Sequence, residues 1–214
     1  MKHSYSSINC FKNCPRQWEA KYLTYTYKDT GNEFNRWGTK VHSHFEARLK
    51  TATPLPPELA SMEPIMGIVG RMPGTLAVEQ KLAVNVSLAP TDYKAPDAYI
   101  RGIIDLSKIA GANAVVADYK TGKVRDDFYQ LELSALLLMA NFPDVQTVLT
   151  MFLWSKVGTF TKEEYNHLQK QNMWNKIVSD TVRIEQAAAR KEFPPKRSGL
   201  CGWCHLHTCE FCTK

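Results

Sequence analysis

The sequence predicts an α/β (α+β) fold, with a central mixed sheet flanked by helices and a cysteine-rich C-terminal tail. Three observations predict it. The 214 residues, 44% hydrophobic and 22% charged, are ordinary for one globular domain with a full core. Segments rich in Ile, Val and Tyr alternate with amphipathic segments. Four of the six cysteines lie in the last fourteen residues.

We therefore expect a single domain over residues 1–214, with its core at about 36–156. The helical segment 1–35 is expected to pack together with the C-terminal helix and cysteine tail of residues 157–214.

Helical patterns come first along the chain. Residues 6–23 are predicted to be helical with an interruption at Cys14–Pro15, because a proline there ends one helix or begins the next. Residues 36–50 predict an amphipathic helix, and a short helix is expected around 57–69. The four-residue spacing in the second segment is carried by Trp37, Val41, Phe45 and Leu49.

The strands follow, with two more helices between and after them. Asp126 or Asp127 can cap a helix that runs to about Asn141, before Pro143. The segment Thr161–Glu164 has the pattern of a capping box and predicts a long helix to about Lys191. The expected strands are residues 75–84, 98–109, 114–120 and 145–154.

The hairpin between the second and third strands carries the candidate site. Its turn, residues 110–113, contains Gly and Asn, and a turn centred on Gly111–Ala112 sets Asp105 opposite Asp118. Cross-strand partners have Cβ atoms roughly 5 Å apart, so both carboxylates could hold one cation. Lys120 is two residues from Asp118 and shares its face of the strand.

Charge and hydropathy narrow the class of protein. The excess of 27 Lys and Arg over 21 Asp and Glu gives a net charge of +6, which favours an anionic partner such as DNA. The start of the chain has no apolar signal-peptide core, and the longest apolar run, residues 135–140, is too short to span a bilayer. We expect a cytoplasmic protein without a membrane partner, whose cysteines bind a metal or cluster rather than form disulfides.

An ordered set of motifs runs along the chain: Gly38-x2-Val41-His42, Glu79, Gly102-x2-Asp105, Asp118-Tyr119-Lys120-Thr121-Gly122 and Gln130. This set resembles the RecB-like branch of the PD-(D/E)XK nuclease superfamily. The N-terminal Tyr5-Ser6 and Phe11-x2-Cys14-Pro15, with the tail cysteines, are similar to its iron–sulfur members, which include AddB nuclease domains, CRISPR adaptation nucleases and small phage-type exonucleases.

This resemblance implies a metal-dependent deoxyribonuclease, an exonuclease acting on DNA ends or single strands in repair, recombination or phage replication. Lys120 would position the attacking water, and Glu79 could join the site or pair with Lys81. Ser134 stands where the family has the tyrosine of its Gln-x3-Tyr motif. The implied catalytic residues are Asp105, Asp118, Lys120, Glu79 and Gln130. The implied ligands of Mg²⁺ or Mn²⁺ are His42, Asp105, Asp118 and the backbone carbonyl of Tyr119. Lys123 and Arg125 are expected to contact DNA phosphates.

The cysteines have two interpretations. By resemblance, four thiolates hold a [4Fe–4S] cluster that joins the two ends of the chain. Alternatively, the tail alone binds zinc. The cluster ligands would be Cys14, Cys201, Cys204 and Cys209. The zinc ligands would be Cys201, Cys204 and Cys209 with Cys212 or one of His205 and His207. Cys10 and Cys212 are left over in the first interpretation, and either could substitute.

Two other functions remain open: a catalytically inactive DNA-binding module of the same fold, and a zinc-tailed interaction protein. The chain has no Gly-x4-Gly-Lys-Ser/Thr loop, so unwinding would require a helicase or recombination partner. The aromatic residues Trp18, Tyr22, Trp37 and Trp174 are predicted to pack in the core rather than to stack on bases.

Overall fold

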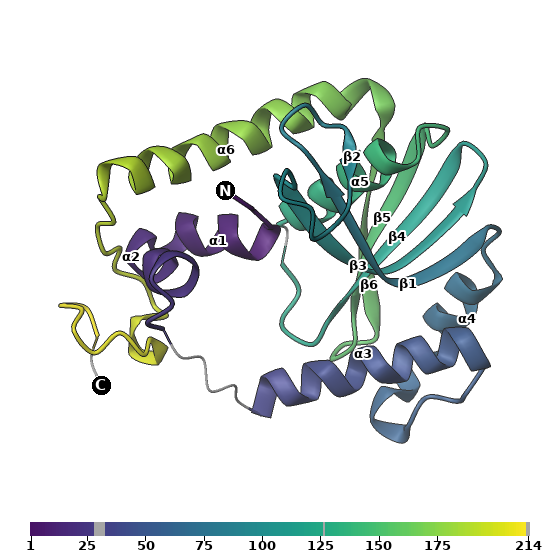
Figure 1. The fold of residues 1–214 in the computed structure, drawn as a ribbon. Helices are drawn as coiled ribbons and strands as arrows, with labels where there is room; N and C mark the ends of the chain where they lie inside the picture. The colour runs from purple at the N-terminus through teal and green to yellow at the C-terminus, as the bar shows by residue number, and fades with distance from the viewer. Residues whose placement is uncertain (28–32, 126, 213–214) are drawn as a thin grey trace. The chain divides into compact units, whose positions relative to one another are not determined.

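The computed structural model describes residues 1–27, 33–125 and 127–212 (Figure 1). The chain divides into two compact units. One unit joins Met1–Gly31 to Asn175–Lys214, and the other is Asn32–Trp174. The predicted fold class is confirmed, and the single-domain organisation stays a prediction. Among the described residues, every helix is too short or too polar to cross a membrane.

A six-stranded sheet forms the centre of the unit Asn32–Trp174, in the order β2-β1-β3-β4-β5-β6. Strands β4 and β5 pair in parallel and are connected through helix α5 (Tyr129–Asn141), whereas all other neighbours are antiparallel. The sheet is therefore mixed, as predicted. Its strands are β1 (Thr75–Val84), β2 (Pro90–Thr91), β3 (Ile100–Ala110), β4 (Asn113–Lys120), β5 (Thr147–Trp154) and β6 (Thr159–Asn166).

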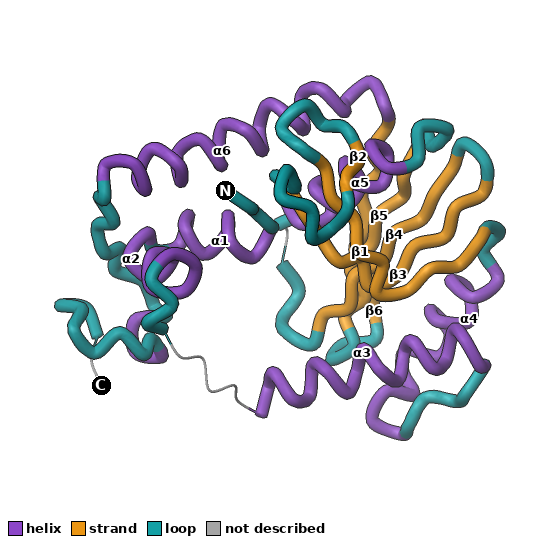
Figure 2. Tube along the Cα trace, in the orientation of Figure 1, coloured by secondary structure: helices purple, strands orange, loops and turns teal. Residues whose placement is uncertain are grey.

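Helices cover both faces of this sheet (Figure 2). On one face, α3 (Glu33–Thr51), η2 (Pro57–Met62) and α4 (Glu63–Arg71) bury a continuous apolar cluster. On the other face, Leu131 of α5 packs with Phe152 and Trp154. Burying these side chains stabilises each layer through the hydrophobic effect. The first cluster includes Val41, Phe45, Met66, Leu106, Ala117, Tyr119 and Leu153.

The unit formed by the two ends of the chain is helical. It contains α1 (Tyr5–Asn13), α2 (Pro15–Trp18), the π-helix η1 (Glu19–Leu23), most of α6 (Lys170–Arg190) and the short η4 (Cys201–Trp203). The predicted interruption is confirmed, because Cys14 separates α1 from α2 and Pro15 is the first residue of α2. Trp18 is buried, stacks on Phe193 with 5.8 Å between ring centroids, and donates to the Ser7 hydroxyl at 2.8 Å.

The prediction of a helix starting at Thr161 is wrong. Residues Thr159–Asn166 form β6, which pairs along its whole length with β5, and Thr161 accepts a hydrogen bond from the Trp154 indole at 3.0 Å. The actual capping box is Asn166 with Gln169, in the short η3 (His167–Gln169) that precedes α6. Pairing with β5 therefore outweighs the local capping pattern.

Candidate active site

The hairpin of β3 and β4 has the predicted register. Ala110 pairs with Asn113 across Gly111, which has the left-handed φ of +59° that the turn requires. The ladder continues only as far as Leu106 and Ala117. Asp105 and Asp118 would be the next pair, but the Asp105 carboxylate instead accepts the backbone N–H of Tyr119 at 2.9 Å. The two strands thus separate where the acidic residues begin.

The same point of the sheet has a second irregularity, on the side of β1. Pairing between β1 and β3 skips Glu79 and Asp105, and Glu79 has a φ of +50°. Leu106 of β3 packs in the apolar cluster under α3 and α4. Gly102, four residues earlier in the same strand, faces the other side of the sheet, because a β-carbon there would lie 2.7 Å from Leu137 of α5. In a regular strand, residues four apart share a face. The strand pair therefore changes face at Glu79 and Asp105.

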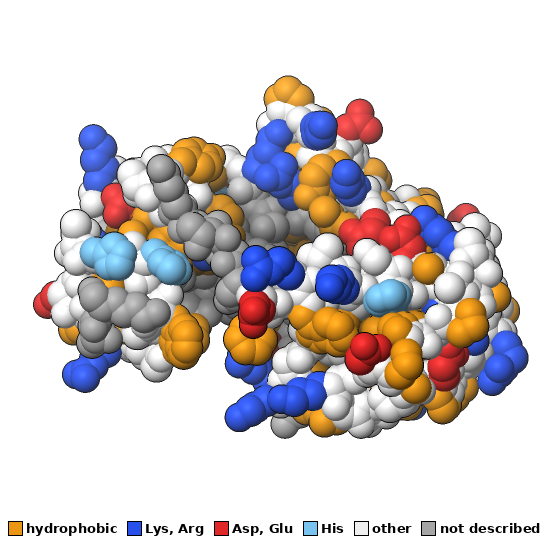
Figure 3. Space-filling model, turned by 90° about the horizontal axis from the view of Figure 1, so that it is seen from below, with side chains coloured by type: hydrophobic (Ala, Val, Ile, Leu, Met, Phe, Trp, Pro, Cys, Tyr) orange, Lys and Arg blue, Asp and Glu red, His pale blue; other side chains and the backbone are white. Residues whose placement is uncertain are grey.

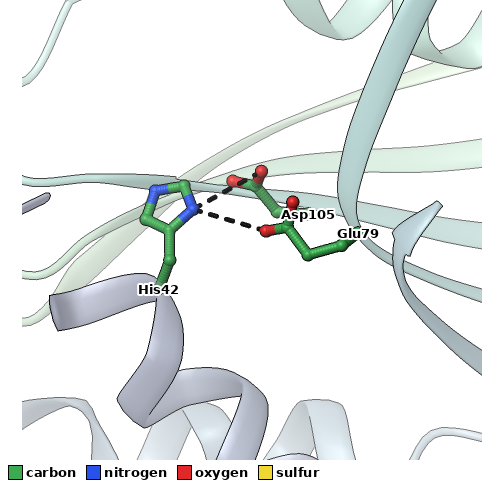
Figure 4. Close-up of side chains that lie close together, drawn as sticks. All are labelled: His42, Glu79 and Asp105. Carbon is green, nitrogen blue, oxygen red and sulfur yellow. Dashed lines mark ion pairs between the residues drawn. The ribbon is translucent and has the colours of Figure 1, made fainter. Parts of the chain in front are cut away.

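This change of face brings three potential ligands together (Figure 4). His42 projects from α3 toward the sheet, and its Nδ1 lies 3.8 Å from Glu79 Oε1 and 3.6 Å from Asp105 Oδ1. One ligand atom from each of the three residues lies within 4.8 Å of the other two. One imidazole nitrogen and two carboxylate oxygens suit Mg²⁺ or Mn²⁺, with the nitrogen favouring Mn²⁺.

Aromatic packing fixes the histidine. The Tyr119 ring meets the His42 ring edge to face at a centroid distance of 5.2 Å, and it contacts Phe45 at 4.8 Å in the same way. A hollow beside the three ligands opens to the surface. It is lined by Thr39, His42, Ser43, Glu46 and Glu79. The site is therefore accessible to a ligand from the α3 side.

Asp118, Lys120 and Gln130 form a closed polar triangle next to the three ligands. The Lys120 ammonium lies 2.5 Å from Asp118 Oδ2, at ion-pair distance although without hydrogen-bond geometry, and donates to Gln130 Oε1 at 2.7 Å. The Gln130 amide in turn donates to Asp118 Oδ1. The ammonium also lies over the Phe152 ring, 5.0 Å from its centroid. Helix α5 thereby holds Lys120 close to the point where β3 and β4 separate.

Burial makes the two carboxyl groups weak acids. The pKa of Asp105 rises to about 8, chiefly through burial and then through the nearby Asp118 charge, while the Tyr119 N–H opposes the rise. Burial also raises the pKa of Asp118, against the opposing effects of Lys120 and His42. Without a cation, the raised pKa favours the protonated form of Asp105 near neutral pH. A divalent cation would replace that proton and relieve the charge repulsion.

The remaining predicted residues lie around this centre. Lys123 and Arg125 are exposed in the segment after β4, and no ion pair of theirs occurs within the described ranges. The Ser134 hydroxyl, at the position of the family tyrosine, donates to the Gln130 carbonyl at 3.0 Å. The ion pair found for Glu79 is with His42 rather than with Lys81. The role of the Tyr119 carbonyl as a metal ligand stays a prediction.

The cysteines gather in the unit formed by the chain ends. One pocket there is lined by five of them together with Gln17 and Lys196, and all six are free thiols. Gln17 donates to the Cys204 sulfur at 3.7 Å and accepts from the Cys10 thiol at 3.6 Å. The pKa of Cys10 rises to about 11, mainly through burial. The pocket cysteines are Cys14, Cys201, Cys204, Cys209 and Cys212.

Comparison with known proteins defines the class to which this architecture belongs. The model of the PD-(D/E)XK nuclease superfamily matches residues 2–210, so the chain belongs to that superfamily of phosphodiester-cleaving enzymes. No curated protein matches the chain. A crystal structure described as a "Putative exonuclease" from Eubacterium rectale is similar, at a TM-score of 0.57 and 14% identity, covering 96% of this chain and 88% of that one. The crystal structure of SSO0001 matches with a TM-score of 0.49 and 12% identity, over 100% and 87% of the two chains.

Proposed function

We propose that the protein is a metal-dependent deoxyribonuclease of the RecB-like branch, acting as an exonuclease on DNA ends or single strands. The observation that carries the proposal is the convergence of His42, Glu79 and Asp105 beside the triangle of Asp118, Lys120 and Gln130. The net charge of +6 suits a polyanionic substrate. The word exonuclease in the name of the similar crystal structure supports the exonuclease assignment.

The metal ion would be held by His42, Asp105, Asp118 and the Tyr119 carbonyl, with Glu79 as an additional carboxylate at the same centre. Mg²⁺ or Mn²⁺ supplies an acidified water and offsets the charge of the phosphate. The raised pKa values of Asp105 and Asp118 show that both carboxylates are buried close to other charges, where a bound cation would stabilise their ionised forms.

Lys120 orients the attacking water and stabilises the additional negative charge on the phosphate in the transition state. Its ammonium can do so because Gln130 and Asp118 fix its position, and because the Phe152 ring excludes water from its other side. Lys123 and Arg125 contact neighbouring phosphates through their exposed side chains.

The cysteine pocket holds a [4Fe–4S] cluster through Cys14, Cys201, Cys204 and Cys209. The donor set fits, because thiolates from both ends of the chain line one pocket. Tetrahedral zinc would hold its sulfur ligands about 3.8 Å apart, given Zn–S bonds of about 2.3 Å. The resemblance of Cys14-Pro15 to the cluster-bearing nucleases is what favours the cluster over zinc in this proposal.

We place this activity in the cytoplasm, where reduced thiols such as these six persist. A separate helicase or recombination protein would supply unwound ends. The same activity would serve repair, recombination or phage replication.

The decisive experiment incubates purified protein with end-labelled linear DNA and with circular DNA, in Mg²⁺, Mn²⁺ or EDTA. We expect metal-dependent loss of the linear DNA alone. Asp118→Asn and Lys120→Ala should abolish it, whereas Asp144→Asn, an exposed carboxylate in a turn, should retain it. Binding of DNA without any metal-dependent cleavage would instead support the inactive DNA-binding module.

The cluster has its own test. Anaerobically purified protein should be brown and contain about four iron and four sulfide per chain. Colourless, active protein with one zinc per chain would contradict the cluster and support the zinc site.

A further inference from the structure

Helix α3 carries an apolar stripe of which only one end is covered. Val41 and Phe45 are fully buried against the sheet. Phe34 and Trp37 continue the same stripe at helical spacing toward the N-terminal end, but 80% and 38% of their surfaces are exposed. The prediction that Trp37 packs in the core is therefore wrong. Two large aromatic side chains lie together on one exposed helix face, which is the kind of patch that marks a binding site.

The surroundings of this aromatic pair are open and contain both charges, because the exposed Glu33 lies one turn before Trp37 and two basic residues lie on the same stretch of helix. A β-carbon on Gly38 would meet no atom within 4 Å, so packing does not explain a glycine in this helix, where it is destabilising. Arg36 and Lys40 are exposed on the same helix, and within the described ranges neither has an ion pair. Figure 3, which views the molecule from the α3 side, shows hydrophobic side chains exposed among lysines, arginines and acidic residues.

The aromatic pair also lies close to the candidate metal ligands. With a rise of 1.5 Å per residue, Trp37 is about 7.5 Å from His42 along the helix axis, and Phe34 is about 4.5 Å beyond Trp37. Successive bases of a strand are stacked about 3.4 Å apart. At that spacing, a strand whose phosphate lies at His42 and Asp105 would have about its second base level with Trp37 and about its third or fourth base level with Phe34 along the helix axis. Because Trp37 is also about 140° around the helix from His42, the strand would have to cross the helix at Gly38 to reach it.

We propose that Trp37 and Phe34 form a stacking platform for unpaired bases about two to four nucleotides from the cleaved phosphate, which makes the protein selective for single-stranded DNA. This inference rests on the proposed deoxyribonuclease function. Bases fit this surface because flat aromatic rings offer stacking and Arg36 and Lys40 offer contacts to phosphates. Gly38 leaves the space through which a strand passes from the platform to His42.

The test measures binding without cleavage. Fluorescein-labelled single-stranded oligonucleotide and a blunt duplex of the same sequence are titrated with the Asp118→Asn variant, and again with otherwise unaltered protein in EDTA, following anisotropy. In both backgrounds, Trp37→Ala and Phe34→Ala should each raise the Kd for the single strand about 5- to 150-fold. They should change the Kd for the duplex less than threefold. Trp37→Phe should restore most of the affinity, because it keeps a stacking ring.

Leu168→Ala is the matched control, because Leu168 is also a large and 78% exposed apolar side chain. It should leave both Kd values unchanged. An unchanged Kd for the single strand in Trp37→Ala and Phe34→Ala would overturn the proposal, as would equal weakening for single strand and duplex. A fall in melting temperature with unchanged binding would also overturn it, by showing that another part of the chain covers this face. A protein that binds single strands through Trp37 but cleaves no DNA would contradict only the proposed nuclease function.

Discussion

The carboxylate site and the cysteine pocket take their side chains from very different distances along the chain. His42, Glu79, Asp105 and Asp118 belong to neighbouring elements of one sheet unit, and hydrogen bonds such as that from Tyr119 hold them without a metal. The cysteines come from the two ends of the chain. Sheet pairing can preform the first site, whereas the second brings together segments separated by most of the sequence. Removing the metal proposed for each site should therefore affect the two sites in different ways.

The largest effect should be on the catalytic rate, from a substitution at the carboxylate site that leaves the fold intact. Asp118→Asn should lower kcat by about 10³-fold, because it removes a proposed metal ligand and the partner of Lys120. Its effect on the melting temperature in EDTA should be small, because removing a buried carboxylate offsets the lost ion pair with the partly exposed Lys120. Single-turnover cleavage and thermal unfolding measure the two quantities. Parallel losses of activity and stability would mean that the site is not preformed.

The cysteine pocket should show the opposite behaviour. Cys204→Ser should lose the bound metal and destabilise the helical unit by several kcal/mol, because metal binding to thiolates is coupled to folding. Amide hydrogen exchange should accelerate in Met1–Gly31 and Asn175–Lys214, while β3 and β4 keep their protection. Thr208→Ala, at an exposed position of the tail that does not line the pocket, is the control. Uniform acceleration over the whole chain would remove the distinction between the two units.

In the metal-free protein, the free energy of unfolding should depend on pH through the buried carboxylate site. Because the folded-state pKa of Asp105, about 8, lies above its ordinary value of 3.8, the folded protein binds a proton more tightly than the unfolded chain. The free energy of unfolding should thus fall as pH rises from about 4 to about 8. Mn²⁺ should restore it, with an affinity that increases up to tenfold per pH unit in the upper part of this range. Denaturation with and without Mn²⁺ at pH 6 to 8.5 measures both, and Asp105→Asn should reduce the dependence, leaving the part due to Asp118, whose pKa burial also raises.

The smallest expected effect is the change in stability when Glu79, whose backbone is left-handed, is replaced. Its φ of +50° costs roughly 1 kcal/mol that glycine avoids. Glu79→Gly should therefore be at least as stable as the unaltered protein in EDTA, yet bind Mn²⁺ more weakly. Glu79→Val should be less stable than both, since β-branched residues avoid this conformation. Urea unfolding and metal titration check these outcomes, and a destabilised Glu79→Gly would show that the side chain supports the fold.

The sequence predicted those features that depend on local pattern. The turn at Gly111 determines the register of β3 and β4, and Pro15 determines the break between α1 and α2. The change of face at Glu79 could not be predicted, because a glutamate with a left-handed φ gives no compositional signal. Strand β6 was mistaken for a helix because Thr161–Glu164 satisfies a local capping pattern that pairing with β5 overrides.

The sequence could predict which residues belong to the site, but not how their side chains are oriented. The spacing of Asp105, Asp118 and Lys120 on a hairpin places them together. The support of Lys120 by Gln130 follows from how α5 packs, which spacing along the chain does not encode. The orientation of His42 by the Tyr119 ring was missed altogether, because the ring lies on the opposite face of β4 from its neighbouring acidic residue.

The hydrogen bond between Asp105 and the Tyr119 N–H gives the carboxylate a second task. In a continuous ladder, that N–H would be paired with a carbonyl of the neighbouring strand. Here a side chain stands between the two strands and keeps them apart, so its length sets the width of the opening. Glutamate at this position would have the same charge but would space β3 and β4 differently. Aspartate at this position therefore affects the spacing between β3 and β4 as well as providing a carboxylate.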